Sequence, residues 1–244
     1  MARSRYEGTR MFHLVTRTWN PVTGCRHDCV YCWARKLVET RLSKVTKKYR
    51  EGFKPKLHEE ELRVEFKPSE FVFVCDMGDL FGGWVPREWI LKVLDVVRRF
   101  PKTTFLFLTK NPDRYLDFED ILRELDNVVL GATIETDNDW MYWYYNISRA
   151  PQPSGRLLAM RRLRRRGFTN IMISIEPILY FTDFFAYSII DIEPAFVYVG
   201  YDNYGNKLPE PPLYRTLRLI GILRSHGITV YTKTLRKAWW EEGG

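Results

Sequence analysis

The feature that most constrains the fold of this sequence is an alternation of short apolar runs with segments of helical periodicity. We predict strands at the following apolar runs: 12–19, 71–75, 104–109, 128–134, 170–175, 196–199 and 228–231. Between them apolar residues recur at helical spacing, for example at Ile90, Val93, Leu94 and Val97. Because buried strands that alternate with amphipathic helices form parallel βαβ units, the pattern predicts an α/β fold with a parallel sheet.

Polar side chains follow the predicted strands at the points where the strands end. They are Asp76, Asp79, Lys110, Glu135, Glu176, Asp202 and Lys233. The carboxyl ends of parallel strands meet at one edge of the sheet, where barrel enzymes place their reactive groups. We therefore expect these side chains to line one pocket. Six strand–helix units and a closing strand are too few for a complete eight-stranded barrel.

Three of the four cysteines directly follow the first predicted strand, with the spacing C-x3-C-x2-C at Cys25, Cys29 and Cys32. Three thiolates can bind three irons of a cubane [4Fe–4S] cluster, which leaves the fourth iron open for a substrate or cofactor. A structural zinc site is the alternative, because His27 or Cys75 could complete a set of four ligands. A disulfide framework is not expected, since three cysteines within eight residues leave an odd thiol.

This spacing, with Tyr31 directly before the last cysteine, resembles the radical S-adenosylmethionine (SAM) superfamily. In that superfamily SAM chelates the open iron, and its reductive cleavage yields a 5′-deoxyadenosyl radical that abstracts a hydrogen atom. Most of the chain resembles one subfamily, which is phage- and archaea-associated and distantly similar to spore photoproduct lyase. The stretches that carry this resemblance are 18–33, 77–81, 108–112, 131–135, 174–177 and 197–200. The turn at 201–205 departs from the glycine-rich, acidic turn of that subfamily, which weakens any transfer of substrate.

The resemblance implies a partial (β/α)6 TIM-like barrel of the radical SAM type, and it assigns roles to single residues. The cysteine triad would bind the cluster, and Tyr31 would pack against the adenine of SAM, with an ordinary core position as the alternative. The remaining candidates for binding SAM or substrate are Asp76, Met77, Gly78, Asp79, Lys110, Glu135, Ser174 and Glu176. Turn chemistry or structural ion pairs would explain the same carboxylates.

Two further residues are candidates for catalysis itself, Cys75 and Lys233. In spore photoproduct lyase a cysteine outside the cluster returns a hydrogen atom to the product radical, and Cys75 is the corresponding candidate here. A free cysteine is more commonly a small buried hydrophobic residue, so that interpretation stays open.

The net charge of +8 and the pI of about 9.3 permit binding to nucleic acid. We expect a basic insertion at about 44–68, which forms either a lip that binds phosphates or a solvated loop. We also expect an aromatic loop at 140–145, which forms either a platform that stacks a base or a lid over the core. The helix from about 155 to 166 is expected to present its arginines, Arg156 included, to solvent, with Leu158 and Leu163 facing inward.

The substrate that we predict is a nucleic acid or nucleotide base, and a small metabolite or a peptide is the alternative. A competing class is a non-enzymatic nucleic-acid-binding module with structural zinc.

Length and composition predict a single domain over 1–244 in the cytoplasm. No apolar run is long enough to cross a membrane, the first ten residues lack the apolar core of a signal peptide, and the cysteines show no pairing pattern. Many arginines and glutamates beside a single glutamine, Gln152, fit a thermophile composition. Radical SAM chemistry also implies an electron donor such as ferredoxin or flavodoxin.

Overall fold

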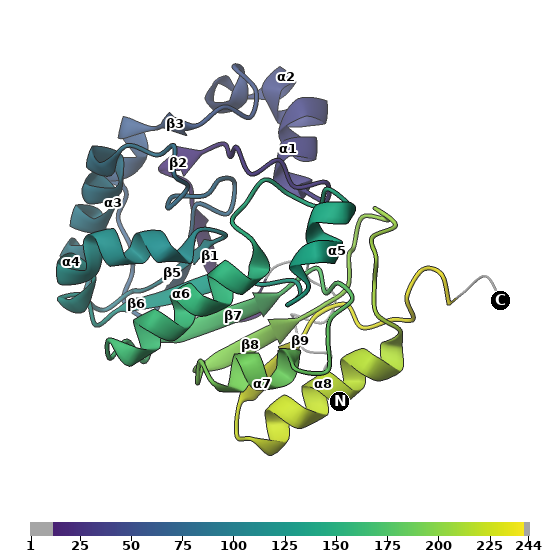
Figure 1. Ribbon diagram of the computed structural model, residues 1–244. Coiled ribbons are helices and arrows are strands. Elements are labelled where there is room, and N and C mark those ends of the chain that lie inside the picture. Colours follow the sequence, from purple (N-terminus) through teal and green to yellow (C-terminus); the bar gives the residue numbers. More distant parts are fainter. Residues whose placement is uncertain (1–11, 242–244) are drawn as a thin grey trace, which may run out of the picture.

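The computed structural model describes residues 12–241, and its centre is a seven-stranded parallel sheet (Figure 1). The strands, in their order across the sheet, are β1 (Arg17–Trp19), β4 (Phe71–Val74), β5 (Thr104–Thr109), β6 (Val128–Thr133), β7 (Ile171–Ile175), β8 (Phe196–Val199) and β9 (Thr229–Thr232). Each strand pairs with the next in parallel, and β1 and β9 are the edges in the described part of the chain. The predicted α/β fold with a partial, unclosed barrel is therefore confirmed. The first strand is shorter than predicted, because the segment from Phe12 to Thr16 makes a turn before β1.

The helices are α1 (Trp33–Leu37), α2 (Ser43–Val45), α3 (Arg87–Arg99), α4 (Glu119–Arg123), α5 (Asp139–Tyr144), α6 (Pro153–Arg165), α7 (Phe185–Ile190) and α8 (Leu213–Ser225). The longer helices lie along the outside of the sheet, whereas α1, α2 and α5 lie beyond the carboxyl ends of its strands (Figure 1). A π-helical turn, Val38–Leu42, joins α1 to α2, and short 3-10 helices occur at Lys47–Tyr49, Glu59–Arg63 and Pro112–Phe118. The predicted apolar stripe of α3 is buried, as expected from its spacing.

Three helical segments differ from the prediction. The expected loop at 140–145 is mostly the helix α5, and α7 had no prediction at all. In α6 Leu163 faces the core as predicted, but Leu158 is 44% exposed. Leu157 and Met160 take the inward positions instead. Leu157, Met160 and Leu163 follow one another at intervals of three residues and therefore lie on one face of the helix. Leu158 lies on a different face.

The inner face of the sheet is closed at one end by an apolar layer. Phe73, Leu106, Val129, Met172 and Tyr198 alternate with residues that face the helices, as strand geometry requires. Two residues from the turn before β1 pack onto this layer, Phe12 and Val15. The open space on the inner face therefore lies at the carboxyl ends of the strands.

The basic insertion is folded onto the cysteine loop rather than extended from it. Its strand β3 (Lys56–Leu57) pairs antiparallel with β2 (Val22–Thr23), which directly precedes the loop. Gly24 adopts a φ of +82°, and a Cβ there would lie 2.2 Å from the carbonyl oxygen of Lys54. Only glycine fits this approach, so the insertion and the cysteine loop form one unit. No helix in residues 12–241 combines the length and apolar character needed to cross a membrane.

Candidate active site

A cavity of about 720 Å³ lies at the carboxyl ends of the strands and brings together most of the predicted site residues. Those that line it are Cys25, Cys29, Tyr31, Cys32, Cys75, Asp76, Gly78, Asp79, Lys110, Ser174, Glu176 and Lys233. Asp202, which was predicted as a strand-end residue, also lines it. Met77 and Glu135 do not reach the cavity surface. Met77 packs with Ala34 and Val38, and Glu135 is fully buried behind the wall.

The three clustered cysteines face this cavity, and each sulfur takes part in one hydrogen bond. These bonds are His27 N–H to Cys25 Sγ at 3.4 Å, Arg35 N–H to Cys32 Sγ at 3.4 Å, and Cys29 Sγ with Ser148 Oγ at 3.1 Å. Burial is the main factor that raises the pKa of the Cys25 and Cys32 thiols. Such thiols become thiolates when a metal binds, and hydrogen bonds to sulfur are a usual part of an iron–sulfur site. The donor set fits a cluster with three cysteine ligands.

The same residues do not favour a mononuclear zinc site. In the described part of the chain no three His, Cys, Asp or Glu side chains are arranged to hold a metal ion directly. The Nε2 of His27 is 2.9 Å from Asp79, and its ring packs edge-on against Trp84, so it is already engaged. In a cubane each thiolate binds a different iron, and the sulfurs need not converge on one point.

Asp79 connects the cysteine loop to the end of β5. Its two oxygens accept four hydrogen bonds, from His27 Nε2 at 2.9 Å, Thr109 Oγ1 at 2.7 Å, the Lys110 amide at 3.0 Å and the Phe81 amide at 3.1 Å. Burial acts to raise the pKa of Asp79, but the bond from His27 and the other donors hold it below its usual value. Asp79 is therefore an ionised structural junction at the cavity wall.

Asp76 has a different environment, although it is only three residues away. One carboxylate oxygen accepts a hydrogen bond of 2.6 Å from the amide of Asn20, whose own oxygen accepts from the Met77 N–H. Burial raises the pKa of Asp76. A carboxylate with a raised pKa and few partners gains from binding a cation, so Asp76 is the better-placed acid for an ammonium group.

Glu135 lies at the centre of a buried charged network behind the cavity wall. Its Oε2 is 2.7 Å from Arg156 Nη1, its Oε1 accepts a hydrogen bond from the Tyr31 hydroxyl, and Lys110 Nζ is 3.4 Å from Oε1. Burial favours the neutral acid, but Arg156 and Lys110 hold the pKa of Glu135 below its usual value. The network thus fixes two cavity-lining side chains, Tyr31 and Lys110.

The prediction that Arg156 faces solvent is wrong, since its side chain is 0% exposed. It lies on the first turn of α6, where its guanidinium also donates to the carbonyl of Thr133 at the end of β6. A signal was present in the sequence: Arg156, Met160 and Leu163 follow the i, i+4, i+7 spacing of one buried helix face. A charged residue on such a stripe is buried only when paired, and its partner, Glu135, could not be assigned from sequence.

The other arginines of α6 lie on its outer side, as predicted, and most of their charge is compensated. Ion pairs join Arg161 to Asp191, Arg162 to Asp113, Arg164 to Glu193 and Arg166 to Glu119. This helix is therefore a poor surface for phosphates.

Glu176 and Lys233 form a second, partly buried pair at the β7–β9 side of the cavity. Lys233 Nζ is 2.9 and 2.7 Å from the two Glu176 oxygens, and it also lies 4.9 Å from the Phe12 ring. Burial raises the pKa of Glu176 despite the neighbouring ammonium. Ser174, also predicted, lines the cavity from β7.

Cys75 directly follows β4 and also lines the cavity. It has a φ of +60°, a conformation that residues other than glycine rarely adopt and that clusters at functional sites. Burial strongly raises the pKa of its thiol, so the sulfur keeps its proton.

One wall of the cavity was missed by sequence reasoning. It comes from α1 and the π-helical turn, which contribute Trp33, Lys36, Leu37 and Thr40, and from Phe53 in the insertion. The four helical residues follow the i, i+3, i+4, i+7 spacing of one face, so their common orientation could have been predicted. Single-turn π-helices are frequent at functional sites.

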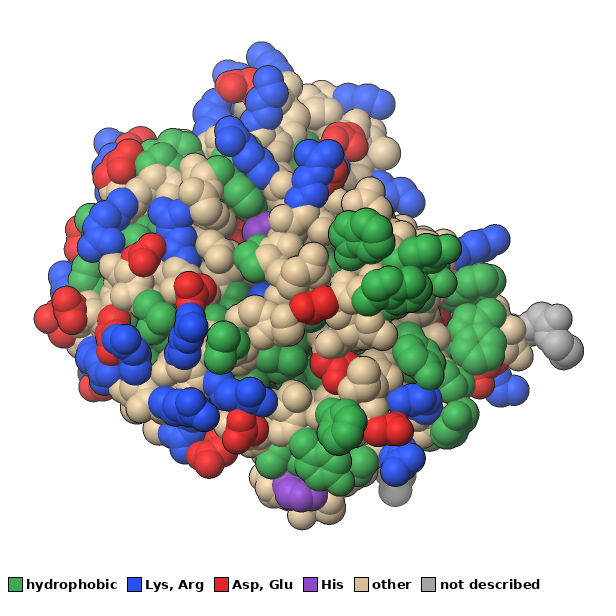
Figure 2. All heavy atoms as spheres, in the orientation of Figure 1, with side chains coloured by type: hydrophobic (Ala, Val, Ile, Leu, Met, Phe, Trp, Pro, Cys, Tyr) green, Lys and Arg blue, Asp and Glu red, His purple; other side chains and the backbone are tan. Residues whose placement is uncertain are grey.

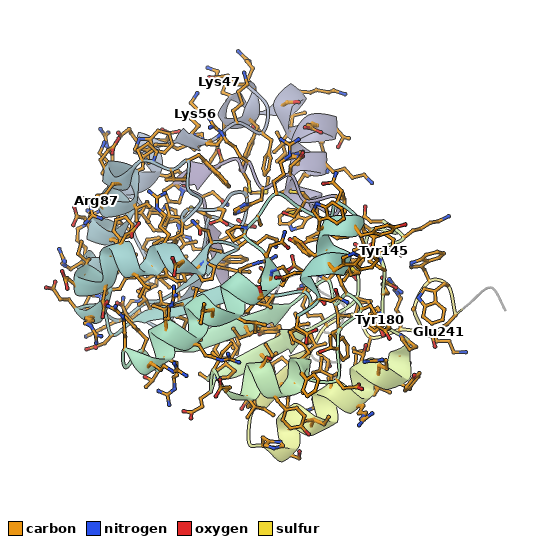
Figure 3. All side chains as sticks on the ribbon, viewed as in Figure 1. Lys47, Lys56, Arg87, Tyr145, Tyr180 and Glu241 are labelled. Carbon is orange, nitrogen blue, oxygen red and sulfur yellow. The ribbon has the colours of Figure 1, made fainter. Side chains whose placement is uncertain are left out.

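Residues 33–56, here called the basic segment, carry nine Lys and Arg against two Glu. Six of the basic residues are exposed and make no ion pair within the described residues: Lys36, Arg41, Lys44, Lys47, Arg50 and Lys54. The blue side chains at the top of Figure 2 lie over this part of the fold, and Lys47 and Lys56 mark its outer edge in Figure 3. Positive charge is thus concentrated beside the cavity mouth.

Comparison with known proteins places the fold. A family described as "Protein of unknown function (DUF5131)" matches residues 11–160. No curated protein sequence matches the chain.

Among solved structures, spore photoproduct lyase complexed with dinucleoside spore photoproduct matches with a TM-score of 0.56 and 11% identity, over 87% of this chain and 75% of the lyase. A mutant of that lyase with bound AdoMet and dinucleoside spore photoproduct matches with a TM-score of 0.56 and 11% identity, over 88% and 76%. Streptococcus suis SuiB bound to its precursor peptide SuiA matches with a TM-score of 0.54 and 11% identity, over 89% of this chain and 48% of SuiB.

These matches show a shared fold, so the chain has the fold of spore photoproduct lyase. At 11% identity the likeness concerns the fold alone. The association with phages and archaea stays a prediction.

Proposed function

The chain belongs to the DUF5131 family, and we propose that it is a radical SAM enzyme. One observation carries the proposal: the three cysteines of a C-x3-C-x2-C motif line a single cavity at the carboxyl ends of a parallel sheet. The similarity in fold to spore photoproduct lyase, one form of which was solved with bound AdoMet, supports SAM-dependent radical chemistry.

In this proposal Cys25, Cys29 and Cys32 hold a [4Fe–4S] cluster. The cluster would supply the electron that cleaves SAM to methionine and a 5′-deoxyadenosyl radical, which then abstracts a hydrogen atom from the substrate. Asp76 offers a carboxylate to the SAM ammonium, while the neighbouring Met77 and Gly78 hold the turn that presents it. Gly78 forms a parallel bridge with Gly24, which keeps this turn against the cysteine loop.

The other proposed SAM contacts come from side chains that the Glu135 network and Asp79 hold in place. Tyr31 presents its ring to the cavity while its hydroxyl donates to Glu135, which suits a residue that packs against an adenine. Lys110 lines the same wall and offers an ammonium to a carboxylate. We assign Ser174 and Glu176 to contacts with the ribose of SAM or with the substrate. Glu135 acts from behind the cavity surface and Asp79 acts within the cavity wall, since the protein already occupies their oxygens.

Cys75 and Lys233 are the proposed catalytic residues on the substrate side. The protonated thiol of Cys75 is the form that can give a hydrogen atom to a product radical. Lys233 brings a charge to the cavity that Glu176 balances until a substrate binds.

We propose a nucleic acid or nucleotide base as the substrate. The exposed cations of the basic segment can meet phosphates, and Trp33 and Phe53 in the cavity lining can stack a base. Spore photoproduct lyase, solved with a dinucleoside photoproduct, supports this choice. SuiB, solved with a precursor peptide, supports the rival peptide substrate, although its match spans 48% of that chain.

The test of the proposed function is the metal content. Anaerobically purified or reconstituted protein should be brown and contain about four iron and four sulfide per chain. The Cys29→Ala variant should lose most of both, while Cys75→Ala, which alters the cysteine outside the motif, should keep them. Colourless protein that holds one zinc would support the alternative of a structural zinc module.

A further inference from the structure

The helix α5 exposes a group of aromatic side chains that take no part in the cavity. Trp140, Trp143, Tyr144 and Tyr145 are each more than half exposed, and Trp140 stacks on Tyr144 with ring centroids 5.0 Å apart. In Figure 2 a hydrophobic patch lies over the position of α5, and Figure 3 shows Tyr145 at this edge of the molecule. Large exposed aromatics in one place mark an interaction surface.

The residues after α5 are bonded directly to the cysteine loop. The Val30 N–H donates to the Ile147 carbonyl at 3.0 Å, and the Arg149 N–H donates to the His27 carbonyl at 2.6 Å. Val30 itself is 51% exposed. We call the surface made by Val30, Trp143, Tyr145 and Arg149 the α5 surface. It joins the exposed aromatics to the outer side of the cysteine loop.

Cys29 connects this surface to the cavity. Its sulfur is 3.1 Å from Ser148 Oγ, and Ser148 lies between Ile147 and the exposed Arg149. The hydrogen-bond partners of the other two sulfurs, the amides of His27 and Arg35, lie within residues 25–35. Because the His27 carbonyl also accepts from the Arg149 N–H, Cys25 and Cys29 both connect the triad with the α5 surface.

Positive charge is in excess on the cysteine-loop side of the α5 surface, where Arg26, Arg35 and Arg149 lie with Asp28. Arg149 and Arg35 both pair with Asp28, so two cations face one carboxylate. Arg26, also in the cysteine loop, is exposed and makes no ion pair within the described residues. An acidic partner would complement this arrangement.

We propose that the α5 surface is the docking site of an acidic protein that delivers single electrons. This inference rests on the proposed function, which consumes one electron for each SAM cleaved. In the step the donor is oxidised by one electron and the cluster is reduced by one. That electron then goes to the sulfonium of SAM, whose C–S bond breaks to release methionine and the 5′-deoxyadenosyl radical.

The composition of the surface favours a redox protein over a nucleic acid. Trp, Tyr and Arg are the residues that dominate protein–protein binding energy, and electron-transfer complexes have the smallest interfaces. Phosphates would instead meet the basic segment, where six unpaired cations gather. The two surfaces thus separate the electron donor from the substrate.

The test uses purified flavodoxin, an acidic flavin protein, as the probe. Trp143→Ala and Arg149→Gln alter the α5 surface. Tyr214→Ala and Arg218→Gln are the matched controls, since both residues are exposed on α8. Calorimetry gives the Kd for flavodoxin, and 5′-deoxyadenosine formation is measured with either reduced flavodoxin or dithionite.

We expect Trp143→Ala to weaken flavodoxin binding about tenfold and Arg149→Gln to weaken it less and to reduce its salt dependence. Cleavage driven by flavodoxin should fall in parallel, while cleavage driven by dithionite and both controls stay unchanged. Unchanged Kd values in both variants would overturn the proposal. The proposal would also be overturned if these two variants lost binding to single-stranded DNA while their binding to flavodoxin stayed intact. Failure of dithionite to support cleavage in the unaltered protein would instead count against the proposed function, and the Kd values would still test the docking site.

Discussion

Among single residues, Glu135 makes the contacts on which most of the candidate SAM wall depends. It accepts from Tyr31 on the cysteine loop, pairs with Arg156 on α6 and lies near Lys110 after β5. Three elements distant in sequence are thereby fixed by one carboxylate. Because the pair with Arg156 is fully buried, removing either partner leaves a buried charge with less compensation.

Arg156→Met should lower the free energy of unfolding by about 3 kcal/mol, since it removes the fully buried partner of Glu135 and leaves the carboxylate with the longer contact to Lys110, 3.4 Å. It should also weaken SAM binding, because Tyr31 and Lys110 lose their fixed partner. Thermal denaturation and SAM calorimetry measure the two effects. Arg165→Met on the same helix is the control, since Arg165 is exposed and makes no ion pair within the described residues. Equal stability of the two variants would contradict the role assigned to this network.

Cys75→Ala tests the hydrogen-atom donor. The variant should still form 5′-deoxyadenosine, because the cluster cysteines are intact, but it should no longer return solvent-derived hydrogen to the product. In deuterated water the unaltered protein should place deuterium in the product through the exchangeable thiol, and the variant should not. Mass spectrometry of the product decides. Equal deuterium content in both would reduce Cys75 to a packing residue.

Among the elements, the cysteine loop and the basic insertion act as one. Gly24 meets the backbone of Lys54 and Pro55, β2 pairs with β3, and the buried His58 is 2.8 Å from the hydroxyl of Thr23. A loop that must present three sulfurs at a fixed spacing is thus held from outside by the insertion.

Gly24→Ala should disrupt this unit, since the added Cβ would lie 2.2 Å from a carbonyl oxygen at a φ of +82°. Gly205→Ala is the matched control. It also has a positive φ, +67°, but nothing lies within 4 Å of the added Cβ, so it should cost only about 1–2 kcal/mol. We expect Gly24→Ala to bind less than half the iron of Gly205→Ala after reconstitution. Equal iron content would show that the loop holds its shape without the insertion.

The strand-and-helix pattern and the strand-end residues could be predicted, because each follows from local periodicity and from the geometry of parallel sheets. Six of the seven strands lie close to their predicted positions, and twelve of the fourteen predicted site residues line the cavity. Burial of Arg156 and the full engagement of Asp79 depend on partners that are distant in sequence. The folding of the insertion onto Gly24 likewise depends on a contact that no local pattern encodes.

At the scale of the whole molecule, charge is distributed unevenly. The basic segment contributes one wall of the cavity and has six cations that make no ion pair with any described residue, whereas the arginines of α6 are mostly matched by carboxylates. If the same net charge were spread evenly over the surface, a polyanion would have no preferred face to bind. The concentration at the mouth favours a polyanionic substrate.

Lys44→Gln with Lys47→Gln should weaken binding to single-stranded DNA or RNA and lower the slope of log Kd against log salt by about 1.4, as two phosphate contacts on a single strand predict. Arg165→Gln with Arg218→Gln removes two charges from α6 and α8 and should leave the slope unchanged. Binding is measured across a salt series. No binding by the unaltered protein even at low salt would favour a small metabolite or a peptide as substrate.

The most direct test of the central claim is the formation of 5′-deoxyadenosine from SAM. Reconstituted protein is incubated anaerobically with SAM and dithionite, and the nucleoside is measured by liquid chromatography and mass spectrometry. We expect the unaltered protein and Cys75→Ala both to form 5′-deoxyadenosine, whereas Cys25→Ala, Cys29→Ala and Cys32→Ala should not. Protein that carries a full complement of iron and sulfide yet forms no 5′-deoxyadenosine would contradict the central claim.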